Sequence, residues 1–215
     1  MSLIGKLSFA CKVARPGRIF LRRLINLSTS VKQLDHYIHI DKEAREDIKW
    51  WHDFIATWNG ISIIPDQSGK KVYLFTDASS VGLGGFLGSS WFSSKWPQSH
   101  KDYHINIKEL LAVLAAVFSW SKSLKNKHVV LFTDNLDIVQ IWTSGSSKNA
   151  DIMKLIRALF LFCAKQNIIL SLRHIYGFVN IKADCLSRLS IQKFKKLHPS
   201  AETWPTPIDP LIWSV

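Results

Sequence analysis

The tetrapeptide LFTD occurs twice in this 215-residue chain, each time at the end of a short apolar run. Residues 72–76 lead into Asp77, and residues 129–133 lead into Asp134. Both runs are rich in β-branched and aromatic side chains, which predicts two buried strands. The residues after each LFTD differ, so the tetrapeptide is not part of a longer internal repeat. Each aspartate is either an ordinary turn residue or one half of a shared site.

A parallel pairing of the two strands would place the aspartates side by side. Neighbouring strands lie about 4.8 Å apart, and functional residues of such sheets collect at the carboxyl ends of the strands. Two carboxylates at that spacing repel each other unless a cation lies between them. Because oxygen ligands select hard cations, this arrangement predicts a site for Mg²⁺ or Mn²⁺.

Two further carboxylates occur in segments that are predicted to be helical. Glu109 lies near the start of a Leu- and Ala-rich helix over residues 105–124, and Asp184 lies in the first turn of a short helix over 181–189. Each of them alone is explained as a helix-start residue that the helix dipole favours. Together with the two strand-end aspartates they make four acids, which favours one shared site.

The chain is expected to contain a helical segment, a linker, a main domain and a tail. The helical segment is predicted to break near Pro16 and to hold a helix from the N-cap Asp41 to about Trp58. The predicted boundaries are residues 1–64 for the helical segment, 65–70 for the linker, 71–190 for the main domain and 191–215 for the tail.

Within the main domain, strands come first and then alternate with helices, which predicts an α/β fold: a mixed five-stranded sheet flanked by helices. Strands are predicted at residues 72–76, 81–87, 90–93, 129–133 and 168–174. Helices are predicted at residues 105–124, 136–142, 150–165 and 181–189.

The composition indicates a packed, cationic protein. Hydrophobic residues make up 47% of the chain, which argues against disorder, and the net charge is +12. This charge favours nucleic acid over a membrane surface as partner, with a merely cationic, solubilising surface as the alternative. The three cysteines form no CxxC pair, and no run of 18 apolar residues occurs. We therefore expect no zinc site, no membrane partner and an intracellular location, in the cytoplasm or the nucleus.

Three glycines follow the first LFTD, at positions 82, 84 and 85. They lack the GxGxxG spacing of a dinucleotide site. Glycines in a strand permit a close approach of backbone or ligand, or mark a bulge.

Four motifs occur in the order TDAS(x)₂GxGG, NIKELLA, FTDN and H(x)₉D. In this order they resemble ribonuclease H over residues 71–190. The chain is more closely similar to reverse transcriptases of DIRS-type retrotransposons. Residues 15–23 resemble the end of such an enzyme's thumb, residues 41–54 its connection, and residues 194–213 the tail after its ribonuclease H domain.

The resemblance implies two-metal hydrolysis of the RNA strand of RNA–DNA hybrids, with two Mg²⁺ or Mn²⁺ ions. It implies that Asp77 bridges both ions, that Glu109 and Asp134 bind one of them and that Asp184 binds the other. His174 is expected to help product release. The expected substrate contacts are Asn106, which would read a ribose 2′-hydroxyl, with Ser79 and Asn135.

The implied partners are an RNA–DNA hybrid and the polymerase part of the same element. The alternative is a catalytically inactive nucleic-acid-binding or structural connection remnant of such a polyprotein. Departures from the family pattern occur around the last motif. Tyr176 stands where proline is common, Phe178 where a basic or polar residue is usual, and Cys185 where alanine is common.

Overall fold

The computed structural model describes residues 2–11, 17–31, 37–57 and 71–214. The chain divides into two compact units. One comprises Met1–Asp66 with Ser144–Ser146, and the other comprises Gln67–Thr143 with Ser147–Val215. The break predicted near Pro16, the end of the helix at Trp58 and the linker over 65–70 lie outside the described residues.

The described residues of the first unit form three helices: α1 (Leu3–Ala10), α2 (Gly17–Thr29) and α3 (Lys42–Thr57). Asp41 caps α3 as predicted, because the backbone N–H of Ala44 donates to its Oδ1 at 2.7 Å. Helices α2 and α3 pack through stacked rings of Phe20 and Trp50, whose centroids lie 3.9 Å apart. A helical segment therefore precedes the sheet, as predicted.

The second unit is built on a mixed five-stranded sheet in the order β3-β2-β1-β4-β5. Strands β1, β2 and β3 pair antiparallel, whereas β1, β4 and β5 pair parallel. This confirms the predicted fold class. The strands span Val72–Ala78 (β1), Gly82–Leu87 (β2), Ser90–Lys95 (β3), His128–Thr133 (β4) and Ile169–His174 (β5).

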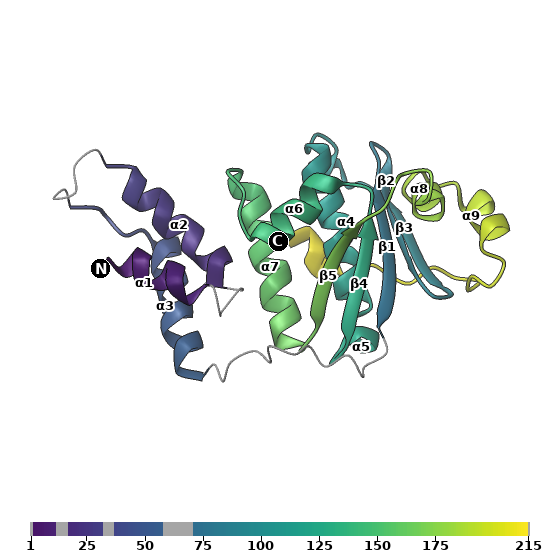
Figure 1. Cartoon of the computed structure of the whole chain (residues 1–215). Helices are drawn as coiled ribbons and strands as arrows, with labels where there is room; N and C mark the ends of the chain where they lie inside the picture. The colour runs from purple at the N-terminus through teal and green to yellow at the C-terminus, as the bar shows by residue number, and fades with distance from the viewer. Residues whose placement is uncertain (1, 12–16, 32–36, 58–70, 215) are drawn as a thin grey trace. The chain divides into compact units, whose positions relative to one another are not determined.

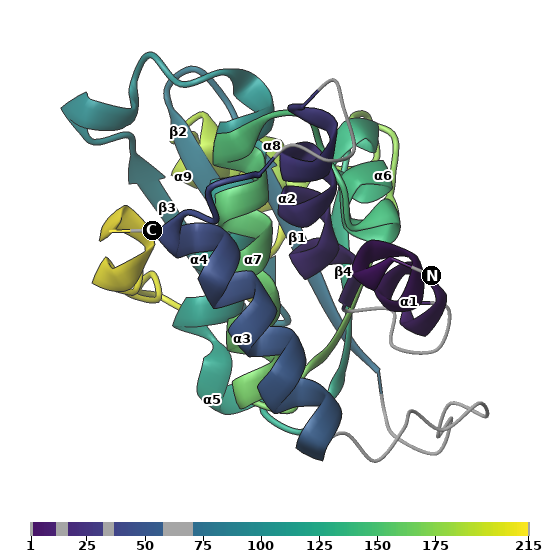
Figure 2. The same ribbon diagram turned by 90° about the vertical axis from the view of Figure 1, so that its left-hand side faces the viewer.

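Helices cover the sheet on both faces, with α4 and α7 on one side and α8 and α9 on the other (Figure 1). Figure 2 looks towards the first of these faces and shows α7 in front of the strands. The helices of this unit span Ile105–Ser119 (α4), Ser121–Leu124 (α5), Leu136–Ser144 (α6), Ala150–Lys165 (α7), Ile181–Ser187 (α8) and Ile191–Leu197 (α9), with 3-10 turns at Gln98–His100 and Pro210–Ser214.

The prediction of one continuous helix over 105–124 was wrong, because the chain leaves helical geometry at Trp120 (φ −100°, ψ 17°). The Trp120 ring is buried against Phe92, with ring centroids 5.2 Å apart. Its indole N–H donates to the Thr206 hydroxyl at 3.1 Å. Tertiary packing of this ring accompanies a break that the local sequence of good helix formers does not signal.

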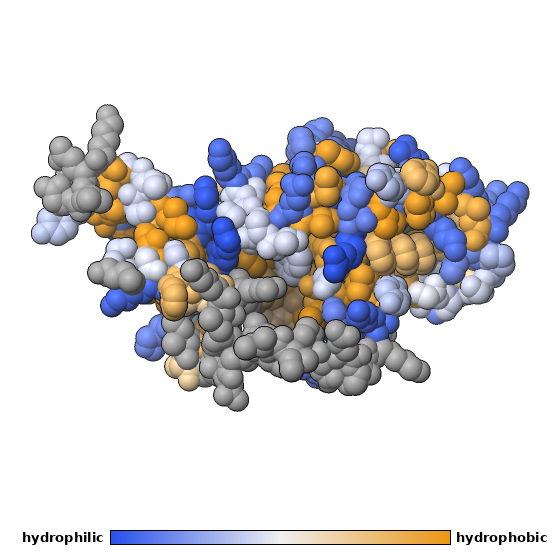
Figure 3. Space-filling view, in the orientation of Figure 1, coloured by the Kyte–Doolittle hydropathy of each residue, from blue (hydrophilic) through white to orange (hydrophobic). Residues whose placement is uncertain are grey.

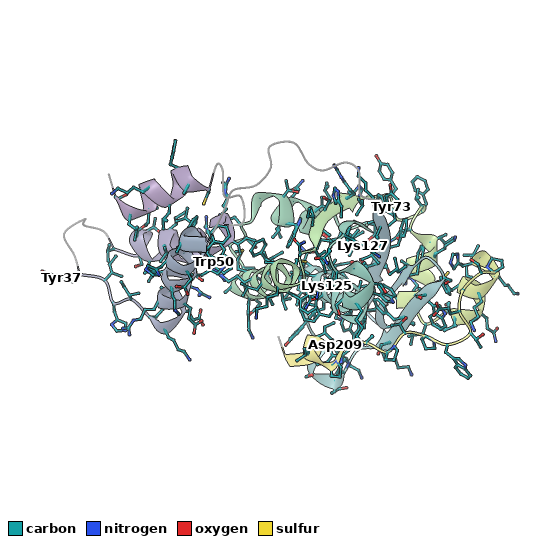
Figure 4. The ribbon with its side chains drawn as sticks, turned by 90° about the horizontal axis from the view of Figure 1, so that it is seen from below. Tyr37, Trp50, Tyr73, Lys125, Lys127 and Asp209 are labelled. Atoms are coloured by element: carbon teal, nitrogen blue, oxygen red, sulfur yellow. The ribbon has the colours of Figure 1, made fainter. Side chains whose placement is uncertain are left out.

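Alternate residues of the central strands enter the core, as the period of a strand requires. Leu74 on β1 and Leu131 on β4 are fully buried, whereas Tyr73 is half exposed. Seen from below, Figure 4 labels Tyr73 with Lys125 and Lys127, near the end of the sheet where β1 and β4 begin. The functional end of the parallel strands is the opposite one.

The residues predicted as a tail pack against β2 and β3. Phe194 on α9 is fully buried in a cluster with Phe86 and Trp91. The indole N–H of Trp91 donates to the carbonyl of Glu202 at 2.8 Å, and its own carbonyl accepts from the N–H of Thr206 at 2.7 Å. Among the described residues, no helix has the length and apolarity needed to cross a membrane.

Candidate metal centre

The two LFTD sequences lie side by side in the sheet. β1 and β4 pair in parallel with Leu74 opposite Leu131 and Phe75 opposite Phe132. The identical tetrapeptides are therefore in register, and each continues into its aspartate at the same edge of the sheet. Asp77 is still within β1, whereas Asp134 directly follows β4.

Three carboxylates from β1, α4 and the residue after β4 meet at this edge. One oxygen each from Asp77, Glu109 and Asp134 can be chosen so that all lie within 4.8 Å of one another. Asp77 and Glu109 are each only 4% exposed, and Asp134 is intermediate in burial. The two LFTD aspartates therefore meet, together with a third acid from α4.

Glu109 reaches the edge because α4 crosses the sheet next to β1. Its Oε1 accepts from the backbone N–H of Ala78 at 3.3 Å, and its Oε2 accepts from the Thr133 hydroxyl at 3.4 Å. The carboxylate is thus held between the ends of both LFTD strands.

Asp184 lies on α8, beside this cluster but outside the group of three. The Ser187 hydroxyl, also on α8, donates to Asp77 Oδ2 and is close to the Asp184 carbonyl, at 3.0 Å. Asp184 Oδ1 itself accepts from the guanidinium of Arg188 at 2.6 Å. In this structure an arginine therefore occupies one oxygen of the fourth predicted ligand.

Helix α8 comes this close because β2 carries glycine. Gly84 pairs with Asp77 across the β1–β2 ladder. A Cβ atom at position 84 would overlap with the Leu186 side chain and lie 2.6 Å from the backbone nitrogen of Ser187. The sequence left open whether these glycines permit a close approach or mark a bulge, and at Gly84 the structure shows the close approach of the α8 backbone. The β1–β2 register is continuous over Leu83–Leu87 and the β2–β3 register over Gly82–Leu87, so the bulge alternative is excluded.

Burial and mutual repulsion raise the pKa values of the clustered acids. Burial raises the pKa of Asp77 to about 7, with Asp134 and Asp184 adding to the shift and the hydrogen bond from Ser187 opposing it. Burial, followed by the charges of Asp77 and Asp134, raises the pKa of Glu109 well above its usual range. The pKa of Asp134 is also raised, again chiefly by burial and then by Asp184.

This chemistry fits a divalent cation. The cluster offers oxygen ligands alone, which suits Mg²⁺ or Mn²⁺ better than softer metals. Buried carboxylates that raise one another's pKa are stabilised in their charged form by a cation between them. Asp77, Glu109 and Asp134 would hold such an ion.

His174 lies at the carboxyl end of β5, next to the cluster. It pairs with Thr133 in the β4–β5 ladder, one residue before Asp134. Its ring packs edge-on against Tyr176, with centroids 5.5 Å apart. Its role in product release stays a prediction.

Asn106 and Asn135 form a hydrogen-bonded chain beside the acids. The side-chain N–H of Asn135 donates to Asn106 Oδ1 at 2.9 Å, and that of Asn106 donates to Asp137 Oδ2 at 3.0 Å. Ser79, in contrast, is 6% exposed, and its hydroxyl donates to the Ser187 carbonyl at 2.9 Å. Substrate contacts by Asn106, Asn135 and Ser79 stay predictions.

Sequence reasoning missed Ser187, Asn180 and Asp137. Asn180 is 2% exposed and donates to the Thr76 carbonyl at 2.9 Å, directly before Asp77. Ser187 follows Asp184 by three positions, a spacing that places two helical residues on one face. The spacing of Ser187 from Asp184 is therefore the sequence signal from which its place beside the acids could have been predicted. Asn180 and Asp137 lie in no pattern that predicts these contacts.

Known proteins share sequence similarity with this chain. Residues 67–162 match a family model described as the RNase H-like domain found in reverse transcriptase. The chain is also 32% identical over 126 residues to the enzymatic polyprotein of Figwort mosaic virus (strain DxS). That match covers 53% of this chain and 18% of the polyprotein. Residues 67–162 are thus similar to RNase H-like domains of reverse transcriptases.

Similar solved structures include two RNases H1. LC11-RNase H1, isolated from compost, is 19% identical, with a TM-score of 0.48 over 57% of this chain and 96% of that one. RNase H1 from Halobacterium salinarum is 16% identical, with a TM-score of 0.45 over 58% and 99%. The protease-reverse transcriptase of Prototype Foamy Virus is 11% identical, with a TM-score of 0.34 over 73% of this chain and 21% of that one.

Proposed function

We propose that this RNase H-like domain hydrolyses the RNA strand of RNA–DNA hybrids with the help of two Mg²⁺ or Mn²⁺ ions. The observation that carries the proposal is the meeting of Asp77, Glu109 and Asp134, with one oxygen of each within 4.8 Å of the others, at the carboxyl edge of the sheet. The family match and the net charge of +12 support a nucleic-acid substrate.

When bound, a pair of such ions activates a water molecule and stabilises the leaving oxygen of an in-line displacement. The chain's own task is to hold the ligands rigid. Thr133 and the N–H of Ala78 orient Glu109, while Ser187 orients Asp77. We assign Asp184 as the fourth ligand, which requires it to exchange its pairing with Arg188 for an ion.

Substrate recognition is assigned to the groups around this edge. The chain of hydrogen bonds from Asn135 through Asn106 to Asp137 fixes the orientation of the two amides, so that Asn106 can meet a ribose 2′-hydroxyl. We assign Ser79 to substrate binding and His174 to product release. The Ser79 hydroxyl stabilises the turn between β1 and β2, because it accepts from the N–H groups of Val81 and Gly82.

The wider assignment is a reverse transcriptase of a DIRS-type retrotransposon, with the polymerase part of the same element as partner. The chain corresponds to about a fifth of the viral polyprotein that it matches. The helical segment, residues 1–64, then represents thumb and connection, and contributes basic residues for grip on the hybrid.

The test is cleavage of a hybrid labelled on its RNA strand, with Mg²⁺ or Mn²⁺. The full chain is compared with Asp77→Asn and with Asp102→Asn, which changes an exposed acid outside the cluster. We expect cutting by the chain and by Asp102→Asn, and none by Asp77→Asn. A folded chain that leaves the hybrid intact with both metals contradicts the proposal.

A second candidate is an inactive nucleic-acid-binding remnant. It is favoured by the ion pair of Asp184 with Arg188, which removes one oxygen from the predicted ligand set. In that case the parent chain binds the hybrid without any metal-dependent turnover, and Arg188→Ala, which frees the Asp184 oxygen, gains cleavage.

A further inference from the structure

The loop over residues 175–180, between β5 and α8, is tied to both LFTD strands. The N–H of Ile175 donates to the Thr133 carbonyl at 3.0 Å, and the side chain of Asn180 donates to the Thr76 carbonyl at 2.9 Å. These two acceptors directly precede Asp134 and Asp77. Both ends of the loop are therefore fixed next to the metal centre, so the loop has a defined position relative to the carboxylates.

The middle of this loop presents two aromatic rings to solvent. Tyr176 is 66% exposed and Phe178 is 80% exposed. Their rings are nearly parallel, at 9°, with centroids 5.5 Å apart. Between them Gly177 passes so close to the site that a Cβ atom there would lie 3.1 Å from Asp134 Oδ2. Exposed parallel rings at this place have no structural task in the core.

From this geometry we propose that Tyr176 and Phe178 form a stacking platform for an unpaired base of the nucleic acid, next to the paired stretch that is cut. The inference rests on the proposed function and extends it to the substrate: hybrids whose RNA continues as a single strand. Aromatic side chains bind unpaired RNA in this way, because every base offers a π-face and stacking tolerates any sequence.

Size and charge favour a base over a protein as the occupant. A stable protein interface needs about 800 Å² on each partner, from roughly 20 to 30 residues. The loop offers only the two rings and the exposed side chain of Val179. The exposed cations Arg173, on β5, and Arg188, which directly follows α8, lie on either side of the loop and supply positive charge for a phosphate backbone. Figure 3 shows hydrophobic residues among hydrophilic ones on the surface of this unit, without one dominant apolar face in that view.

The experiment measures binding of two hybrids to the full chain carrying Asp77→Asn, so that nothing is cut. One hybrid is blunt, and the other has a single-stranded RNA extension with 2-aminopurine at its first unpaired position. The extended hybrid is made in two versions, with the extension at the 5′ end or at the 3′ end of the RNA. The variants are Phe178→Ala, Phe178→Trp, which keeps a ring, and Val179→Ala, which removes apolar surface of the same loop without an aromatic ring.

We expect one extended hybrid to bind more tightly than the blunt one and to lose 2-aminopurine fluorescence on binding. Phe178→Ala should reduce the preference for the extended over the blunt hybrid on the order of tenfold and abolish the loss of fluorescence. Phe178→Trp and Val179→Ala should keep the preference and the loss of fluorescence. Equal binding of blunt and extended hybrids, or equal losses in Phe178→Ala and Val179→Ala, overturns the platform. Cleavage of the blunt hybrid by the chain without Asp77→Asn, measured separately, reports on the proposed function alone.

Discussion

Asp77 and Asp134 end the same tetrapeptide on neighbouring strands, yet they lie in different surroundings. Asp77 is inside β1, 4% exposed, opposite Gly84 of β2 and under Ser187 of α8. Asp134 follows the end of β4, is less buried and lies beside Gly177 of the 175–180 loop.

The difference comes from the elements that cover each strand end. An antiparallel strand and a helix enclose Asp77, so burial raises its pKa to about 7. Asp134 borders a loop, and burial raises its pKa as well, without so large a shift. The same local sequence thus yields a buried central acid and a more open one, and their variants should differ.

The largest expected effect is on cleavage. Asp77→Asn and Asp134→Asn each remove a charge from the cluster, and we expect each to lower the rate on the order of a hundredfold or more, with the greater loss for Asp77→Asn. Rates with labelled hybrid under single-turnover conditions check this. A larger loss for Asp134→Asn would show that the more open acid is the central ligand.

The stability of the metal-free protein should depend on pH through Asp77. Its folded pKa lies above the unfolded value of 3.8, so the stability contributed by the protonated form is present below about pH 4 and is lost as the pH rises through 7. Asp77→Asn should therefore stabilise the metal-free protein at pH 8, by up to about 4 kcal/mol, and change little at pH 4.

Urea unfolding in the presence of a chelator measures this effect, with Asp134→Asn as the comparison. We expect a smaller gain for Asp134→Asn. Added Mg²⁺ should stabilise the parent chain and not Asp77→Asn, because the ion binds only the folded, charged cluster. Equal stability of parent and Asp77→Asn at pH 8 would mean that Asp77 is less buried than the structure shows.

The glycines next to the two aspartates should respond differently. Gly84→Ala puts a methyl group against the backbone of α8, and overpacking of this kind costs about 1–3 kcal/mol. In Gly177→Ala the added methyl group lies 3.1 Å from Asp134 Oδ2, and this side chain can move aside. We therefore expect a smaller loss of stability for Gly177→Ala than for Gly84→Ala. Thermal unfolding compares the two, and a milder effect for Gly84→Ala would place α8 farther from β2.

The smallest effect is expected for Ser187→Ala. The Ser187 hydroxyl lowers the pKa of Asp77, so its removal should raise that pKa further. We expect the acidic limb of the pH–rate profile to move to higher pH and Mg²⁺ affinity to weaken a few-fold, with activity recovered at high pH and high Mg²⁺. Ser187→Thr, which keeps the hydroxyl, should behave like the parent. An unchanged profile in Ser187→Ala would contradict this role.

Much of the architecture follows from local patterns. Apolar runs of strand length and the helical period are short-range signals, and they predicted the five strands, the helix over 150–165 and the Asp41 cap. The break at Trp120 was missed because a ring that is buried against Phe92 and Thr206 depends on residues distant in sequence. For the same reason the packing of the tail against β2 and β3 has no local signature.

The sequence by itself determined the repeated strand ending, the number of acids and their order along the chain. Only the tertiary structure decided how they meet. It set the two LFTD runs in register, brought α8 over Gly84, placed Ser187 against Asp77 and paired Asp184 with Arg188. These contacts join residues up to 110 positions apart, and such distances in space follow from strand order and packing, which no local run of residues contains.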